Sequence, residues 1–402
     1  MAVIDIFNAA YVKSEEVAAL VAAELGLAAV RDAEILSATS ERFGIAESRL
    51  HRTLFGKPSV FNSFTHERER SVACMRATLA EQLRRDDLLL FGWTGLLIPR
   101  TISHLLRALL AADLPFRASV ATATEGVNAE EAMRLVHKAD ESLYTWTEYV
   151  CGGNPWDESL YDVVVPMGKK SVEQAAEFIV DNARRAVLVP TAQSSQAVTD
   201  FALAARVELA LAEEGHSVGV EAKNGVVSLT INKNVIMLSR LEEELKRLVS
   251  PVKGVRDVVT RVGKDFYQAD IYRRADFSLP SKVLLVDDER EFVETLSERL
   301  TMRDVGSAVV YDGKQALDLL QEEEPEVMIL DLKMPGMDGI EVLRRVRRDH
   351  PNVAVIILTG HGSDRDRETC MALGAFAYLQ KPVDIDVLSS TVKSAYDKVR
   401  AS

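Results

Sequence analysis

The chain has 402 residues, 47% of them hydrophobic and 27% charged, with a formal net charge of −13 at pH 7. These values fit a globular protein of roughly two or three domains, and the acidic balance argues against a nonspecific grip on DNA or on an anionic membrane. The cysteines Cys74, Cys151 and Cys370 are scattered without metal-ligand spacing, and the chain opens without the pattern of a signal peptide. We therefore expect a cytoplasmic protein with no disulfide, zinc site or membrane-inserted segment.

The first predicted elements are a strand at residues 2–7 and a helix that begins near Ser14. The loop between them keeps Lys13 and Ser14 of the phosphate-binding pattern G-x-x-x-x-G-K-[ST], but both glycines, which let the backbone wrap a phosphate, are missing. Glu15 and Glu16 follow in the first helical turn, where they would repel a bound anion. A helix capped by Ser14 is thus favoured over a nucleotide loop, and the retained Lys13 and Ser14 keep nucleotide binding open as the alternative.

Several segments in the first 186 residues resemble the cytidylate-kinase-like family. They are residues 25–36, 126–140 and 159–165, and the helix predicted after Lys170. The resemblance implies a P-loop α/β sandwich that transfers phosphate from ATP to a pyrimidine monophosphate. We therefore expect residues 1–186 to form one α/β domain of this kind.

The departures from that family fall on residues that would handle phosphate. Trp93 and Leu143 stand where relatives carry arginines, and neither side chain can supply the positive charge that clamps a transferring phosphoryl group. Arg100, Arg117 and Arg134 could compensate, but ordinary surface or core-edge roles are favoured for them. The sequence therefore predicts a pseudokinase, with a nucleoside monophosphate kinase as the alternative.

The middle of the chain reads as helix, strand, strand, helix, strand. The elements are predicted at residues 197–214, 216–222, 226–231, 235–249 and 254–262. Asn224-Gly225 between two alternating strands indicates a hairpin. Gly219, Val226-Val227 and residues 254–258 resemble the BON domain, an αββαβ module that contacts phospholipids or small ligands in envelope proteins. Without an export signal, and with acidic residues 242–244 on a helix, protein contact is the expected role here.

The C-terminal part alternates short apolar runs with amphipathic helical segments. The runs lie at residues 283–286, 327–330 and 353–358. Continuous apolar strands that alternate with helices predict a parallel sheet covered by helices on both faces. The predicted domains are residues 1–186, 197–263 and 281–402, joined by linkers at 187–196 and 264–280.

Polar residues follow the ends of these C-terminal strands, which is where open parallel sheets place their functional sites. Asp287 and Asp288 follow the first strand, Asp331 the third, Thr359 the fourth and Lys381 the fifth. Three converging carboxylates repel one another, and a hard divalent ion such as Mg²⁺ offsets that repulsion. The sequence therefore predicts a magnesium site with Asp287, Asp288 and Asp331 as ligands.

Asp331 is the predicted phosphoryl acceptor, because it sits on the central strand and opens the glycine-containing loop 332–339. A carboxylate oxygen can attack phosphorus, while the Thr359 hydroxyl and the Lys381 ammonium can each donate to a phosphoryl oxygen. Lys333 and His361 either tune the lifetime of the aspartyl phosphate by gating water or are plain solvated side chains.

Val-Asp287-Asp288-Glu, Leu-Asp331-Leu-Lys-Met-Pro-Gly-Met-Asp-Gly, Leu-Thr359-Gly-His-Gly and Lys381-Pro382 resemble the response-regulator receiver family in order and spacing. The resemblance covers residues 281–402 and implies a flavodoxin-like (βα)5 fold and phosphotransfer from a sensor histidine kinase or a phosphotransfer protein. It also implies that Tyr378 turns inward on activation and that the Lys381–Pro382 bond is cis.

Taken together, the sequence predicts a multidomain α/β response regulator whose receiver follows its other modules. Phosphorylation of Asp331 is expected to act through contacts of the kinase-like and BON-like modules, in a homodimer or with a downstream protein. DNA binding is not expected, because no basic recognition helix is found upstream. The alternatives are a receiver-controlled cytidylate-type kinase and a phosphate sink in a phosphorelay.

Overall fold

The computed structural model describes residues 3–56, 59–85, 87–235, 237–267, 279–360 and 362–401. Contacts divide the chain into two compact units. The first contains Met1–Lys57, Arg68–Glu213 and Val218–Tyr272, and the second contains Pro58–Glu67, Glu214–Ser217 and Arg273–Ser402. Among the described residues, no helix combines the length and the apolar character needed to span a bilayer.

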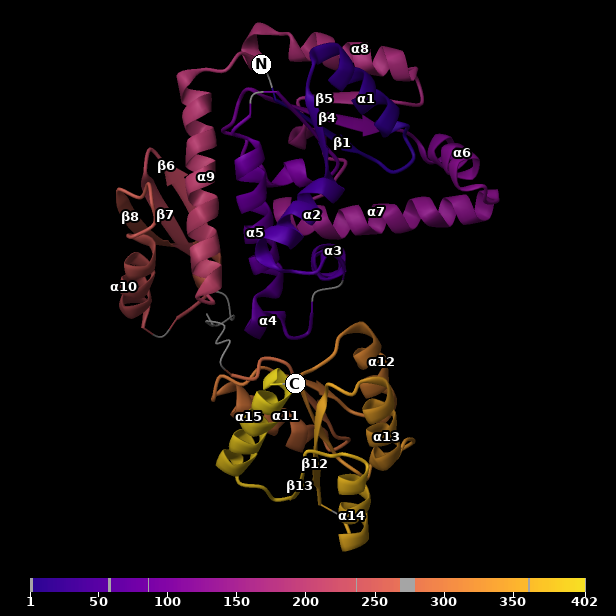
Figure 1. The fold of residues 1–402 in the computed structure, drawn as a ribbon, viewed down its shortest axis with the longest axis vertical. Helices are drawn as coiled ribbons and strands as arrows, with labels where there is room; N and C mark the ends of the chain where they lie inside the picture. The colour runs from indigo at the N-terminus through magenta and orange to yellow at the C-terminus, as the bar shows by residue number, and fades with distance from the viewer. Residues whose placement is uncertain are drawn as a thin grey trace. The chain divides into compact units, whose positions relative to one another are not determined.

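The first unit is built on a five-stranded parallel sheet in the order β2-β3-β1-β4-β5, of which Figure 1 labels β1, β4 and β5. Its central strand β1 alternates, so that Ile4 and Ile6 face one core and Val3 faces another. Both cores are covered by helices, as the parallel sheet requires. The strands are β1 (Val3–Asn8), β2 (Ala28–Arg31), β3 (Leu88–Phe91), β4 (Leu105–Ala111) and β5 (Val163–Pro166).

Helices cover the two faces of this sheet. α1 (Ser14–Leu25) and α8 (Val172–Ala183) pack on the Ile4 face. The other face is covered by α2 (Asp32–Phe43), α3 (Glu47–Phe55), α5 (Glu67–Gln82) and the long α7 (Ala129–Cys151), against which α6 (Leu114–Glu125) packs. Short elements of this unit are η1 (Thr94–Leu97), η2 (Glu158–Leu160) and η3 (Ala186–Leu188). The short helix α4 (Asn62–Thr65) belongs to the second unit.

The start of α1 differs from the prediction in one respect. The helix begins at Ser14 as expected, but Ser14 is its first helical residue and is buried. The N-cap position belongs to Lys13, whose backbone is left-handed (φ 57°), and no side chain caps the helix. The predicted capping role of Ser14 is therefore wrong, because the helix begins one residue earlier than a helix capped by Ser14 would.

The middle of the chain has the predicted αββαβ order (Figure 1). β6 pairs antiparallel with β7 through the left-handed turn Asn224-Gly225, and β8 adds parallel to β7. Its elements are α9 (Ala192–Glu213), β6 (Gly219–Lys223), β7 (Val226–Ile231), α10 (Leu238–Val249) and β8 (Asp257–Val262), followed by η4 (Lys264–Tyr267).

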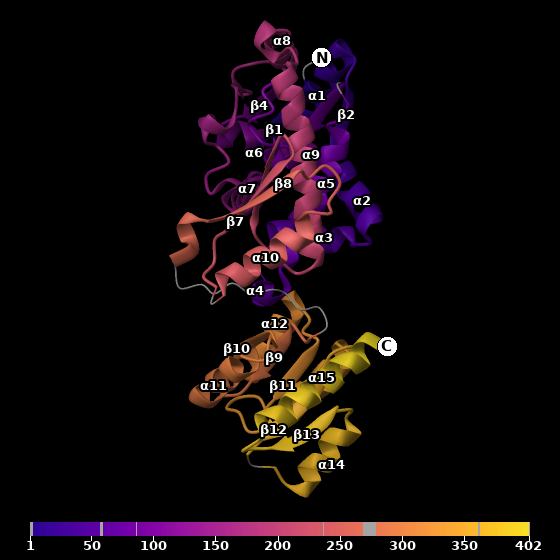
Figure 2. The ribbon, with the colours of Figure 1, turned by 90° about the vertical axis from the view of Figure 1, so that its left-hand side faces the viewer.

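Helix α9 is buried on two sides (Figures 1 and 2). Phe201 and Ala205 close the core on the α2–α5 side of the five-stranded sheet. Leu203, Val207 and Leu211 close the core of the three-stranded sheet. The kinase-like part and the αββαβ part therefore share one helix and form a single compact unit.

The second unit contains a parallel sheet in the order β10-β9-β11-β12-β13. It has the doubly wound parallel architecture predicted for the C-terminal part. Its strands are β9 (Val283–Val286), β10 (Ser307–Val310), β11 (Val327–Leu330), β12 (Ala354–Thr359) and β13 (Ala377–Gln380). The same unit takes in residues 59–67, where the Ser59 hydroxyl donates to Glu323 at 2.7 Å.

Helices cover this sheet on both faces, as Figure 1 shows. α11 (Arg290–Thr301) and α15 (Ile385–Ala401) pack on one face. α12 (Gly313–Glu322), α13 (Gly339–Asp349) and α14 (Asp364–Ala372) pack on the other. Strands β9, β11 and β12 are consequently buried throughout, and polar side chains gather at or beyond their carboxyl ends.

Candidate functional site

The site lies at the carboxyl ends of the strands in the second unit. Val286 of β9 pairs with Leu330 of β11, so the residues that follow, Asp287 and Asp331, emerge side by side. The Asp331 amide donates to the Val286 carbonyl at 2.9 Å and continues the ladder to the point where the chain turns away. Strand pairing alone therefore brings together acids that lie more than 40 residues apart in the sequence.

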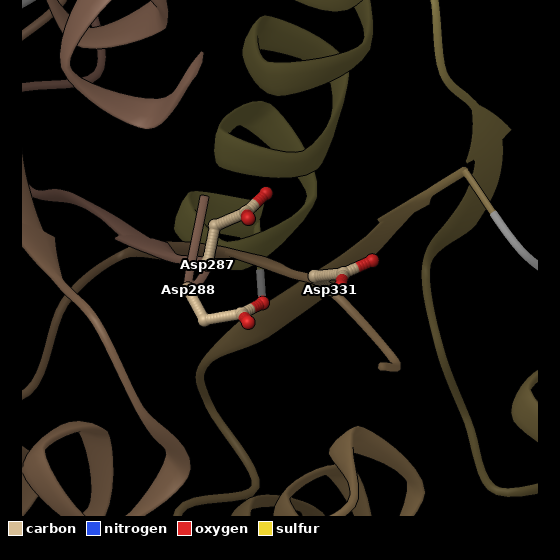
Figure 3. A group of neighbouring side chains, drawn as sticks. All are labelled: Asp287, Asp288 and Asp331. Carbon is tan, nitrogen blue, oxygen red and sulfur yellow. The ribbon is translucent and has the colours of Figure 1, made fainter. Parts of the chain in front are cut away.

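Asp287, Asp288 and Asp331 form an acidic group whose ligand oxygens lie within 4.8 Å of one another. Figure 3 shows the three carboxylates gathered at one edge of the sheet. Asp287 and Asp331 are buried and Asp288 is half-buried. One Asp331 oxygen is buried without a hydrogen-bond partner among the described residues, while the other accepts the Lys333 amide at 3.2 Å. This all-oxygen donor set fits a hard divalent cation such as Mg²⁺.

Lys381 supplies the positive charge beside these acids. Its ammonium lies 2.7 Å from Asp287 and 2.8 Å from Glu289, over the ring of Phe292. Burial alone would lower the pKa of Lys381, but its hydrogen bonds to Asp287 and Glu289 outweigh burial and raise it. Burial raises the pKa of Asp287 despite the opposing effect of Lys381. Lys381 is therefore held as a cation at the rim of the acidic group.

Thr359 and Tyr378 lie on the neighbouring strands. Thr359 is the last residue of β12 and is fully buried, and its carbonyl accepts the Lys381 amide at 2.9 Å. The Tyr378 hydroxyl is buried beside Gly362, where a Cβ at position 362 would meet it at 1.6 Å. The predicted cis bond at Lys381–Pro382 is present.

The remaining residues predicted for this site have different outcomes. Lys333 contributes its backbone amide to Asp331, and its side chain is exposed. His361 lies outside the described residues. Glu289, which the sequence analysis did not single out, contacts Lys381, and the acid directly after Asp287-Asp288 was the signal available for it.

In the first unit, the arginines that could have replaced missing phosphate clamps already have partners. Arg117 is buried, donates two hydrogen bonds to Asp140 at 2.6 and 3.0 Å, and donates to the Ala10 carbonyl. Arg134 pairs with Glu131 on the surface of α7. The guanidinium of Arg117 is therefore already paired within the domain interior.

Arg100 and Lys13 complete this group of cations. Arg100 donates to the Ser159 carbonyl, and it lies 4.0 Å from Asp162. Lys13 occupies the left-handed turn before α1 and is exposed. A cavity lies at the carboxyl end of the five-stranded sheet, and neither of these two residues lines it.

Comparison with known proteins identifies relatives of both parts. The model of the response regulator receiver domain matches residues 283–393, and that of the cytidylate kinase-like family matches residues 3–169. Sporulation initiation phosphotransferase F of Bacillus subtilis is 38% identical over 112 residues, which are 28% of this chain and 90% of that protein. Transcriptional regulatory protein CpxR of Escherichia coli is 40% identical over 114 residues, and this chain spans only 48% of it.

A solved structure, the receiver domain of the Francisella response regulator 1452, matches 30% of this chain and 98% of its own, with 32% identity and a TM-score of 0.28.

Proposed function

The chain belongs, through residues 283–393, to the response regulator receiver family, and on this premise we propose that it is a two-component response regulator phosphorylated on Asp331. The observation that carries the proposal is the convergence of Asp287, Asp288 and Asp331 at one sheet edge. Asp331 is favoured as the acceptor because it follows the central strand and keeps one buried oxygen without a hydrogen-bond partner in the described part of the chain. A receiver of this kind implies a sensor histidine kinase or a phosphotransfer protein as its partner.

In the proposed reaction, an Asp331 oxygen attacks the phosphorus of a phosphohistidine on the partner. The O–P bond forms as the N–P bond of the donor breaks, and the released imidazole takes up a proton. The Lys381 ammonium and the Thr359 hydroxyl, at neighbouring strand ends, would stabilise the phosphoryl oxygens. A divalent cation held by Asp287, Asp288 and Asp331, for which Mg²⁺ fits the donors, would add positive charge at the same oxygens.

The proposal is tested by incubating the full chain with acetyl phosphate and Mg²⁺ and measuring the intact mass. We expect one added phosphoryl group, none in Asp331→Asn, and none when EDTA removes the metal. Asp338→Asn is the matched control, because Asp338 lies in the same loop and caps α13 but is exposed and outside the acidic group. Equal labelling of Asp331→Asn and the native chain would refute the assignment of the acceptor.

For the first unit we propose a pseudokinase domain joined to a BON-like module, which together pass the signal on through protein contacts. The proposed loss of phosphoryl transfer is supported by the pairing of three arginines with residues of their own domain, which are Arg117, Arg134 and Arg100. The αββαβ order supports the BON-like reading. Calorimetric titration of the full chain with ATP and with CMP tests the first point, since heat of binding from either nucleotide would favour the kinase alternative.

A phosphate sink is the second candidate, favoured by similarity to a protein named as a phosphotransferase. A sink must lose its phosphoryl group quickly, whereas a switch must keep it long enough to act. The half-life of phosphorylated Asp331, followed by intact mass after removal of acetyl phosphate, separates these two roles.

A further inference from the structure

The first unit contains a cavity of 440 Å³ at the carboxyl end of its parallel sheet. Asn8, Arg31 and Phe91, the last residues of β1, β2 and β3, form its floor. α3 and α7 contribute further walls. Open α/β sheets bind ligands at this edge, and the volume suits a small organic molecule.

Aromatic rings form one wall of the cavity. Phe55 and Trp93 meet edge to face with centroids 4.6 Å apart, and His51 lies 4.9 Å from Phe55. Behind them, the fully buried Trp146 meets Trp93 edge to face with ring centroids 4.8 Å apart, and it donates its indole N–H to the Trp93 carbonyl. The backbone of Trp93 is fixed from the other side, where its amide donates to Asp32 at 2.7 Å. The wall is therefore held in place before any ligand arrives.

The charged residues that line the cavity disfavour the binding of a phosphate. Arg31 is the only lysine or arginine among the described lining residues, and it lies 3.9 Å from Glu15. Glu15 and Asp32 outnumber it, and although burial raises the pKa of Asp32 to about 6, this carboxylate is still ionised at pH 7. Glu15 and Glu16 also occupy the first turn of α1, where the helix dipole would otherwise attract an anion.

From this combination of rigid rings and excess carboxylate, we propose that the cavity binds a planar aromatic cation and serves as a ligand site without phosphate chemistry. The ring would lie against Trp93 and Phe55, and its positive charge would face Glu15 and Asp32. Aromatic faces attract cations, and the two carboxylates add to that attraction. The proposal goes beyond the function of the receiver and does not depend on phosphorylation of Asp331.

Three probes of matched shape test the proposal: benzamidine, its neutral analogue benzamide and the anion benzoate. Binding to the full chain is followed by ligand-observed NMR, with CMP as a fourth probe. We expect benzamidine to bind most tightly, benzamide more weakly, and benzoate and CMP not to bind. Stronger binding of benzoate or CMP than of benzamidine, or no binding of any probe, would overturn the proposal.

Two variants locate the binding. Ser142→Trp places a bulky ring in the cavity from α7 and should abolish benzamidine binding. Tyr144→Trp adds the same side chain two residues away at an exposed position of α7, and should bind benzamidine as the native chain does. Loss of binding in both variants, with unchanged circular dichroism, would contradict the site.

A third variant tests the role of charge. Glu15→Gln removes one exposed carboxylate at the rim of the cavity. It should weaken the binding of benzamidine about fivefold, because one nearby charge contributes about that much in a mostly aqueous setting. Benzamide affinity should stay the same. An equal loss for both probes would show that the charge of Glu15 is not recognised. Labelling of Asp331 by acetyl phosphate should be unchanged in all three variants.

Discussion

Asp5 is a carboxylate in the middle of the buried and largely apolar strand β1. It is 2% exposed, and one of its oxygens has no hydrogen-bond partner in the described chain. Gly95 of the neighbouring turn makes room for it, since a Cβ there would lie about 2 Å from the carboxyl group. Burial raises the pKa of Asp5 to about 7, although the positive charge of Arg107 opposes this shift.

Asp5 should make the stability of the first unit depend on pH. The folded chain holds the Asp5 proton up to about pH 7, whereas the unfolded chain releases it near the ordinary aspartate pKa of 3.8. The unfolded state therefore binds fewer protons between these values, and this contribution to stability falls as pH rises from about 4 to about 7. Each unit of pKa difference corresponds to about 1.4 kcal/mol.

Asp5→Asn lacks this titration. We expect its melting temperature, relative to that of the native chain, to rise with pH across the window from about 4 to about 7 and to level off above it. Thermal denaturation at several pH values measures the difference. A difference that is constant with pH would show that Asp5 is ionised in the folded protein.

At the scale of elements, α9 is the helix on which two cores depend. Its apolar residues point in opposite directions, Phe201 toward the five-stranded sheet and Leu203 toward the three-stranded sheet. Arg76 lies over the Phe201 ring and pairs with Glu208 of α9 at 2.8 Å, with both side chains about one-fifth exposed. The helix is thus fixed by packing on two sides and by a charged pair.

Truncation of either residue should destabilise both cores at once. Phe201→Ala should cost about 3–5 kcal/mol and Leu203→Ala about 2–5 kcal/mol, because each leaves a cavity in a packed interior. Scanning calorimetry should show the kinase-like and αββαβ parts melting together at a lower temperature in both variants. Gln193→Ala, at an exposed position of α9, is the control. Two separate transitions for these parts would contradict the shared core.

The sequence predicted most elements of the αββαβ part to within a few residues, because strand alternation and the Asn224-Gly225 turn are local signals. It also predicted the acids at the strand ends of the second unit, since apolar runs that end in polar residues mark a parallel sheet. It did not predict that α9 would serve two cores. An apolar helix with no single stripe is compatible with one or two packing partners, and the sequence does not distinguish them.

The cavity wall was missed for a related reason. His51 and Phe55 lie one turn apart on α3, but no spacing in the sequence links them to Trp93, which follows β3. In the sequence, Trp93 stands out only as the replacement for an arginine. In the structure, Trp93 packs against Phe55 and Trp146 as part of an aromatic wall.

At the scale of the whole molecule, a receiver that works as a switch must change the first unit when Asp331 is phosphorylated. We predict that acetyl phosphate with Mg²⁺ alters amide hydrogen exchange in the first unit as well as around the acidic group. The change should be absent in Asp331→Asn and present in the loop control Asp338→Asn. Exchange that changes only within residues 279–401 would favour the phosphate sink instead.

The double burial of α9 also sets where this chain can be cut. A fragment that ends at residue 186 would lose Phe201 and Ala205 and leave apolar surface of α5 and the neighbouring strands open to water. Extending it to Glu213 would restore that layer but strip the opposite side of the helix, where Leu203 and Val207 meet β7. The smallest piece that keeps both sides covered runs through β8, to Val262 or beyond. In recombinant expression, shorter pieces should therefore aggregate, whatever the boundaries of their sequence families suggest.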